Sequence, residues 1–266
     1  MNLLHSIEER FQPFERSISR MIQASVENRA AKIANDTIFL FKIENEVPPE
    51  GVFMSLWAVL VEMSWRIPAG HEWQRCLLLA IHIIRQREGA PNQEEPECKW
   101  HDLPELETRL IEHWELRPVQ QDNEPLPQSL FDFWKNTNSF ASHIVGDGFT
   151  EPLDLAFWEL HESLENPSIQ GPLLDCQVWV AAEWLINCSE PLLKKLTSGE
   201  VLSTGESQSL KTGGLYGKDL APLSLQSWNF WEKRLGGLLH DEAIQDDTKR
   251  HIEEALKVMG SVSKEE

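Results

Sequence analysis

Two polar residues interrupt otherwise apolar helical stretches and are the first candidates for chemistry. Glu183 lies within VWVAAEWLIN, and His82 lies within CLLLAIHII, residues 76–84. A buried carboxyl has a raised pKa unless a base or donor meets it, and a buried imidazole needs a hydrogen-bond partner. We hypothesise that both side chains belong to the polar lining of an internal pocket. The simpler interpretation is that each is a core residue whose polar groups are hydrogen-bonded within the protein.

Four further side chains are candidates for pocket lining or partner binding. Asn136 and Asn138, in FWKNTNSF, offer amide groups. Trp158 projects away from the apolar stripe of its helix, and Phe230 projects away from the stripe that holds Trp228. An exposed aromatic side chain often lines a pocket or meets a partner helix, so we predict one of these roles for both.

The glycines of GGLYGKDL, residues 213–220, do not form a nucleotide-binding motif. A phosphate loop has four residues between its first glycine and the Gly-Lys pair, whereas Gly213 and Gly217 have three between them. Cys98 and His101 lie within one turn, but no second pair completes a zinc site. The sequence therefore predicts no cofactor and no metal.

The same glycines precede a helical pattern and favour a docking role. We predict that residues 213–217 form turns that seat Trp228 and Trp231 on the core, with a lid over a small-molecule site as the alternative. The preceding residues 197–214 are rich in Ser, Thr and Gly and are predicted to form a mobile loop.

Apolar residues recur at spacings of three and four along the whole chain. This predicts an all-α protein, an irregular helical bundle or helical-hairpin array of about ten helices. Residues 77–84 and 173–188 are apolar almost all round and are predicted to be the central helices. Residues 130–145 are predicted to form an ordinary surface helix, with Ser139 on its polar side.

Local signals set several other expectations. Residues 88–124 form an acidic connector whose middle is helical and solvated, and residues 37–43 favour helix over a lone strand. Glu62 and Arg66 have the i, i+4 spacing of an exposed ion pair. Ser224 is placed to cap one late helix, and Asp241 is placed to open the last.

Length and charge narrow the class of protein. A chain of 266 residues with 41% hydrophobic content can form a single globular domain over residues 1–266. A formal net charge of -19 argues against nucleic acid as a partner. The longest apolar stretch is far shorter than a membrane span, and no signal peptide pattern opens the sequence, so we expect an intracellular, cytoplasmic protein with reduced cysteines.

Four segments carry a resemblance to a known family: SLWAVLVEMSWRIPAGHEWQRCLLLAI, FWKNTNSFASHIVGDGF, LAFWELHESLE and GGLYGKDLAPLSLQSWNFWEKRL. In this order they are similar to a fungal family of uncharacterised proteins, the domain of unknown function 3632. The resemblance implies a fungal, all-helical, intracellular protein, and it assigns no activity to any residue. The resemblance also implies a link to fungal secondary metabolism, since genes of this family are frequent near the gene clusters for fungal secondary metabolites.

Two functions of different class follow. In the first, the protein is a non-catalytic interaction module whose helical surface or acidic connector meets another protein, and this is the preferred hypothesis because no catalytic constellation stands out. In the second, it binds or transforms a small molecule of secondary metabolism in an internal aromatic pocket. A closed apolar cavity with convergent polar groups would favour the second, and an open apolar groove would favour the first. The sequence leaves the oligomeric state open.

Overall fold

The computed structural model describes residues 24–43, 49–87, 102–114, 117–119, 125–149, 153–166, 170–198, 213–217 and 223–264. All regular elements in these residues are helices, so the predicted all-α fold is confirmed. They are α2 (Val26–Ile43), α3 (Pro49–Arg66), α4 (Glu72–Arg85), α5 (Leu106–Trp114), α6 (Gln128–Gly146), α7 (Asp154–Leu160), the π-helical η2 (His161–Glu165), α8 (Pro172–Thr197), α10 (Leu225–Leu238) and α11 (Asp246–Val262). The mobility predicted for residues 197–214 concerns mostly positions outside the described residues.

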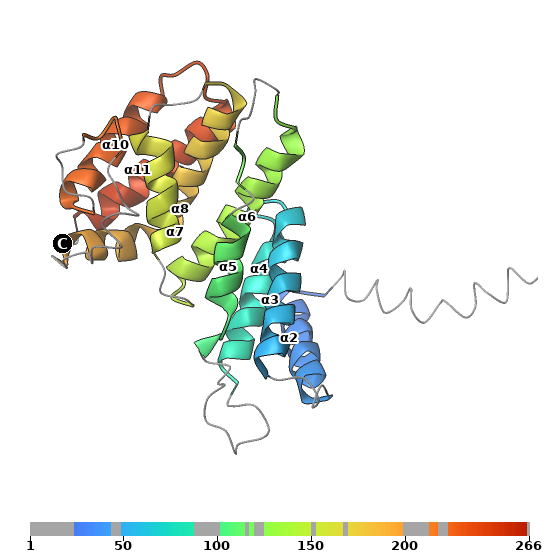
Figure 1. Cartoon of the computed structure of the whole chain (residues 1–266). Coiled ribbons are helices and arrows are strands. Elements are labelled where there is room, and N and C mark those ends of the chain that lie inside the picture. Colours follow the sequence, from blue (N-terminus) through green and yellow to red (C-terminus); the bar gives the residue numbers. More distant parts are fainter. Residues whose placement is uncertain are drawn as a thin grey trace, which may run out of the picture.

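The helices form two groups with α6 between them (Figure 1). One group contains α2 to α5, and the other contains α7, η2, α8, α10 and α11. Helix α6 packs on α3 and α4 in the first group and on α8 in the second. A cluster of buried apolar side chains continues from Ala34 in α2 to Met259 in α11. The division of the chain into domains stays a prediction.

Helix α8 is the centre of the second group. It starts with Pro172, which suits the first turn because proline lacks the N–H that would be unpaired there. It packs on α6, α7, η2, α10 and α11, and buried residues follow one another around its whole circumference from Leu173 to Leu185. The prediction that this segment is a central helix is confirmed.

The prediction that residues 130–145 form a surface helix is wrong. Every residue from Asn136 to Ser142 is buried, including Ser139 on the side predicted to face solvent. Phe133, an apolar residue of the same helix, is 41% exposed. The physical reason is that α6 lies between two groups of helices and is covered from both sides, which the periodicity of one segment cannot show.

The helix of the acidic connector also packs more deeply than predicted. Its middle is helical, as α5, but Leu106, Leu110 and Trp114 are buried. The Trp114 ring lies 5.4 Å from that of Trp134 and 6.1 Å from that of Trp184, centre to centre. One face of α5 is therefore part of the core rather than solvated surface.

Most of the purely local expectations are confirmed. Glu62 and Arg66 form an exposed ion pair at 3.0 Å, and residues 37–43 continue α2. Ser224 caps α10 through a capping box with Ser227. The exception is Asp241, whose carboxylate accepts a hydrogen bond from the Ala243 N–H in a turn, so the last helix begins at Asp246 instead.

The turn at residues 213–217 seats α10, as predicted. The Gly213 N–H donates to Glu165 Oε2 at 3.1 Å, and the Leu215 N–H donates to the Glu165 carbonyl at 2.8 Å. Trp231 Nε1 donates to Glu165 Oε1 at 2.9 Å, and Trp228 and Trp231 are both 1% exposed. Glu165 thus joins the turn and α10 to η2.

In the part of the chain that the structure describes, no helix is long and apolar enough to cross a membrane. Cys76, Cys176 and Cys188 are buried free thiols that fill space in the core. Burial raises the pKa of Cys176 to about 12 and also raises the pKa of Cys188.

Candidate functional site

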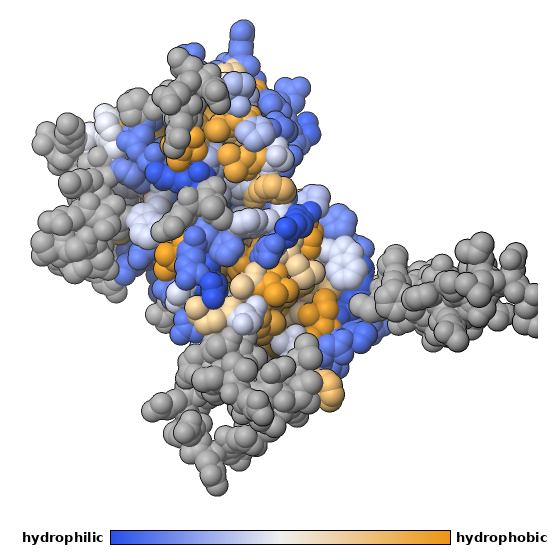
Figure 2. All heavy atoms as spheres, turned by 45° about the vertical axis from the view of Figure 1, so that its right-hand side comes forward, coloured by the Kyte–Doolittle hydropathy of each residue, from blue (hydrophilic) through white to orange (hydrophobic). Residues whose placement is uncertain are grey.

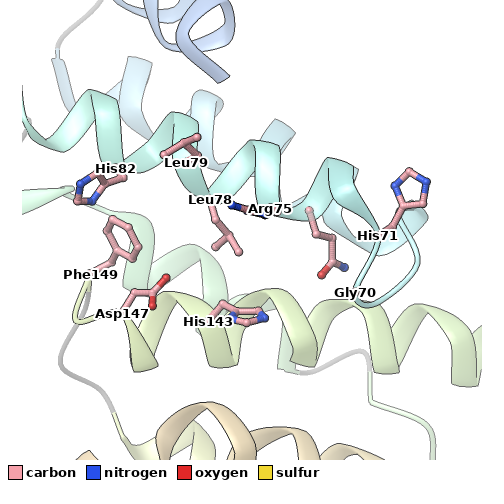
Figure 3. A pocket seen from close by; sticks show the side chains of 10 residues that line it. Gly70, His71, Arg75, Leu78, Leu79, His82, His143, Asp147 and Phe149 are labelled. Carbon is pink, nitrogen blue, oxygen red and sulfur yellow. The ribbon is translucent and has the colours of Figure 1, made fainter. Parts of the chain in front are cut away.

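A concave site lies between α4 and the carboxyl end of α6 (Figure 3). Its volume is about 660 Å³, and it is open to solvent along one side. We call it the α4–α6 groove. It is lined by Gly70, His71, Gln74, Arg75, Leu78, Leu79, His82, His143, Asp147 and Phe149.

The two helices of the groove are held in register at both ends. At one end, Gln74 Nε2 donates to the carbonyl oxygens of Ile67 and Asn136, at 2.9 and 3.0 Å. At the other end, Arg85 donates to the Gly148 carbonyl at 2.7 Å. Helix α4 begins where His71 Nδ1 accepts the Trp73 N–H at 3.2 Å, just after Gly70, whose φ of +73° favours glycine. The groove is therefore formed by α4 and α6, which are connected directly at one end and through the turn after α6 at the other.

Aromatic and charged groups gather at the edges of the groove. Figure 3 shows His82, Phe149 and Asp147 near one end, Arg75 beside Leu78 at the middle, and His71 near the other end. His82 meets Phe149 edge to face at 5.9 Å between ring centres and contacts Gln86 at 2.7 Å. His82 is exposed, so it is not a core residue.

The structure does not bring Glu183 and His82 together. Glu183 is 7% exposed in α8, where it accepts hydrogen bonds from Ser139 at 2.6 Å and from His251 at 2.7 Å. The His251 ring stacks on Trp179, with 4.5 Å between centres. Burial raises the pKa of Glu183, but the hydrogen bonds from His251 and Ser139 outweigh burial and leave the pKa lowered. Glu183 thus joins α6, α8 and α11 through an ionised carboxylate.

The two asparagines have structural partners. Asn136 donates from Nδ2 to the Trp65 carbonyl at 2.7 Å and accepts the Ala69 N–H at 2.9 Å, so it fixes the turn between α3 and α4. Asn138 donates to the Trp134 carbonyl and accepts Trp184 Nε1 at 2.8 Å in the core. Neither side chain belongs to the lining of the α4–α6 groove.

Trp158 and Phe230 are not the exposed aromatic side chains that the sequence suggested. Both are half-buried and pack against the main core cluster. The ring centres of Phe230 and Tyr216 are 5.2 Å apart, so Phe230 helps to hold the turn at residues 213–217 on α10. A helical projection of α10 could not predict the burial of Phe230, because Tyr216, which packs on it, belongs to a different segment.

A buried carboxyl that the sequence analysis did not single out is Glu159 in α7. It is 4% exposed and accepts a hydrogen bond from Trp114 Nε1 at 2.9 Å. Burial raises its pKa to about 7, although Trp114 and the charge of Arg117 act to lower it. A small cleft of about 90 Å³ adjoins Glu159 and is lined also by Arg117 and Glu162. A raised carboxyl pKa beside a cleft could have been found only from the tertiary structure.

Apolar side chains also reach solvent outside the groove. On the face that Figure 2 shows, apolar patches are separated by hydrophilic side chains. Among the residues that the structure describes, the exposed large apolar ones are Phe39, Val59, Met63, Ile111, Val119, Phe133, Leu215 and Leu225. Among the described residues, no three His, Cys, Asp or Glu side chains are placed to hold a metal ion.

A family model matches residues 57–235 and is described as a protein of unknown function (DUF3632). The chain belongs to the DUF3632 family. The match begins within α3 and ends within α10, so this DUF3632 protein carries the whole α4–α6 groove inside the family region. No curated protein and no solved structure matches the chain.

Proposed function

We propose that this DUF3632 protein is a non-catalytic protein-interaction module that receives a segment of a partner protein in the α4–α6 groove. The supporting observation is the shape of the groove. It follows α4 for three turns, has apolar side chains at its middle and is open to solvent. These features favour an elongated occupant that can leave and enter without a change of fold.

The spacing of the lining residues gives the length of the occupant. On α4 they fall at positions 71, 74, 75, 78, 79 and 82, which are successive turns of one helix face. Eleven residues of helix span about 16 Å, a length that about five residues of an extended chain would cover. Recognition of a short segment by a preformed groove is a recurring mode of protein interaction.

The buried polar network argues against a serine nucleophile. In an activated serine the hydroxyl bonds to a histidine, which then removes its proton. Here the carboxylate of Glu183 lies between Ser139 and His251 and accepts from both. The three side chains therefore stabilise the packing of three helices rather than activate a hydroxyl.

A small-molecule function is the second candidate, and it includes the role in fungal secondary metabolism that the family resemblance suggests. Two observations favour it. The groove volume of about 660 Å³ lies within the range of metabolite sites, and Gln74 Oε1 is a buried acceptor without a partner among the described residues. Native mass spectrometry of the protein purified from cells, compared with the denatured mass, tests this candidate directly.

The interaction module is tested by selecting ligands for the groove. A display library of random 12-residue peptides is panned on the wild-type protein, and enriched peptides are measured by fluorescence anisotropy. Leu79→Asp places a charge in the apolar middle, and His143→Trp fills the groove from α6. Leu225→Asp is the matched control, since Leu225 is 49% exposed on α10 and outside the groove.

We expect enriched peptides to bind the wild type and the Leu225→Asp variant alike, and to bind both groove variants at least tenfold more weakly. Circular dichroism checks that each variant is folded. If no peptide is enriched, or if the groove variants bind as well as the wild type, the proposal is wrong. A stoichiometric small-molecule adduct that is lost in His143→Trp would favour the second candidate instead.

A further inference from the structure

We propose that the segment bound in the α4–α6 groove is acidic and donates a main-chain N–H to Gln74. This inference rests on the function proposed above and adds the chemistry of the ligand. It is carried by two independent observations: the charges that line the groove, and an unpaired acceptor at its base.

The groove is less acidic than the protein as a whole. With histidines counted as neutral, the whole chain has a formal net charge of -19, whereas the lining holds one base, Arg75, and one acid, Asp147, together with three histidines. The guanidinium of Arg85, bound to the Gly148 carbonyl, adds a positive charge beside Phe149. An anionic partner is therefore repelled less here than elsewhere on the acidic surface, and the two arginines attract it.

Arg75 is available to that partner. On nearby surfaces Arg29 pairs with Glu72 and Arg66 pairs with Glu62, each at 3.0 Å. Within the described residues Arg75 makes no ion pair. Its charge does reach Glu27 on α2, whose lowered pKa owes more to hydrogen bonds from its backbone and from Ser25.

Gln74 supplies the second observation. The side chain is 2% exposed, and its amide nitrogen donates to two carbonyl oxygens, which fixes the orientation of the amide. Its Oε1 is left without a hydrogen-bond partner among the described residues, although Gln74 lines the groove. Buried acceptors are normally paired, so a donor from the ligand would complete this group. A peptide N–H can donate to Gln74, whereas a bare carboxylate cannot.

The positions of Arg75 and His82 set the spacing of the acidic residues, because a carboxylate can accept a hydrogen bond from either side chain. Arg75 and His82 are seven residues apart on α4, or about 10 Å along its axis. An extended chain covers this length in about three residues. Acids at positions i and i+3 of the segment would then face Arg75 and His82, with the two residues between them over Leu78 and Leu79.

The test uses four fluorescein-labelled octapeptides that share a central Leu-Leu core. The two residues that directly enclose the core are both Glu, both Gln, both Lys, or one Glu and one Lys, and Gly and Ser fill the outer positions. Anisotropy is measured on the wild type, Arg75→Glu, Asp147→Asn and the folded control Leu225→Asp, at about 0.05 and 1 M salt. Both charge variants alter exposed side chains, so we expect all four proteins to fold.

We expect the doubly acidic peptide to bind wild type best, with a loss of about two- to fivefold for each Glu replaced by Gln. Arg75→Glu should remove this preference, and Asp147→Asn should increase it about twofold. The preference should shrink at high salt, because exposed ion pairs are screened. Leu225→Asp should behave as wild type.

The outcomes separate this inference from the function on which it rests. If the four peptides bind the wild type equally well while the library peptides lose affinity in Leu79→Asp, the groove binds peptides but the acidic specificity is wrong. If the doubly basic peptide binds best, the specificity is again wrong. If no library peptide binds in a Leu79-dependent manner, the proposed function itself is wrong. Self-association that Arg75→Glu abolishes would replace the peptide by a second copy of the chain and overturn the inference.

Discussion

Gly213 lies where the absence of a side chain lets two segments touch. A Cβ at this position would lie 2.3 Å from the carbonyl oxygen of Glu165 and 2.6 Å from its Cβ. Both atoms lie on or next to the backbone of η2, so a change of rotamer cannot relieve the overlap. In Gly213→Ala the turn must therefore move away from Glu165 by about 1 Å.

The expected loss of stability follows from the contacts at the turn. Overpacking of a rigid contact costs about 1–3 kcal/mol. The displaced turn would also weaken two hydrogen bonds, from the Gly213 N–H to the Glu165 carboxylate and from the Leu215 N–H to the Glu165 carbonyl. A hydrogen bond to a charged group contributes about 1.5–3 kcal/mol. We therefore predict that Gly213→Ala lowers the free energy of unfolding by about 2–5 kcal/mol.

Urea unfolding, followed by tryptophan fluorescence and by far-UV circular dichroism, measures this change. Gly260→Ala is the matched control, because a Cβ at Gly260 in α11 would meet nothing within 4 Å. Alanine in a helix interior stabilises by about 0.5–1 kcal/mol relative to glycine, so the control should change in the opposite direction. A Gly213→Ala variant within 0.5 kcal/mol of the wild type would refute the docking of the turn on Glu165.

Two further predictions concern buried titratable groups. The pKa of Glu159 is raised from 4.5 to about 7, so the folded state binds more protons between these values, and stability should fall by roughly 3 kcal/mol as the pH rises through them. Glu159→Gln should remove this slope, which unfolding midpoints at pH 5 and pH 8 measure; an unchanged slope would assign it to other groups. Cys76, Cys176 and Cys188 are buried with raised pKa values, so iodoacetamide at pH 8 should leave all three unmodified in the native protein and modify them in urea. Peptide mapping would contradict this by finding a rapidly labelled thiol among the three.

The local sequence determined which segments of the chain form helices. The 3.6-residue periodicity predicted the helical content, and the apolar run at residues 173–188 predicted the central helix α8. The Glu62–Arg66 pair and the capping box of Ser224 also depend on residues within one turn of each other. Such features follow from sequence because the interacting groups are neighbours along the chain.

Local signals failed where a second segment decides the outcome. Ser139 has a polar side chain on the expected polar face of α6, but it is buried because α8 packs on α6 and Glu183 accepts its hydrogen bond. Trp158 and Phe230 are half-buried for the same reason, since neighbouring elements cover them. Asp241 has the residue type of a helix cap, but it closes a turn instead.

The candidate site belongs almost entirely to the tertiary structure. The sequence placed His82 on a central helix, but it could not show that Arg75 and His82 share a groove with His143 and Asp147, more than sixty positions away. That groove exists because Gln74 binds the backbone of α6 and Arg85 binds the backbone of the turn that follows α6, which together hold the two helices in place. Periodicity determined which residues are helical, whereas the pairing of distant helices decided which polar groups meet, since burial and hydrogen bonding depend on neighbours in space.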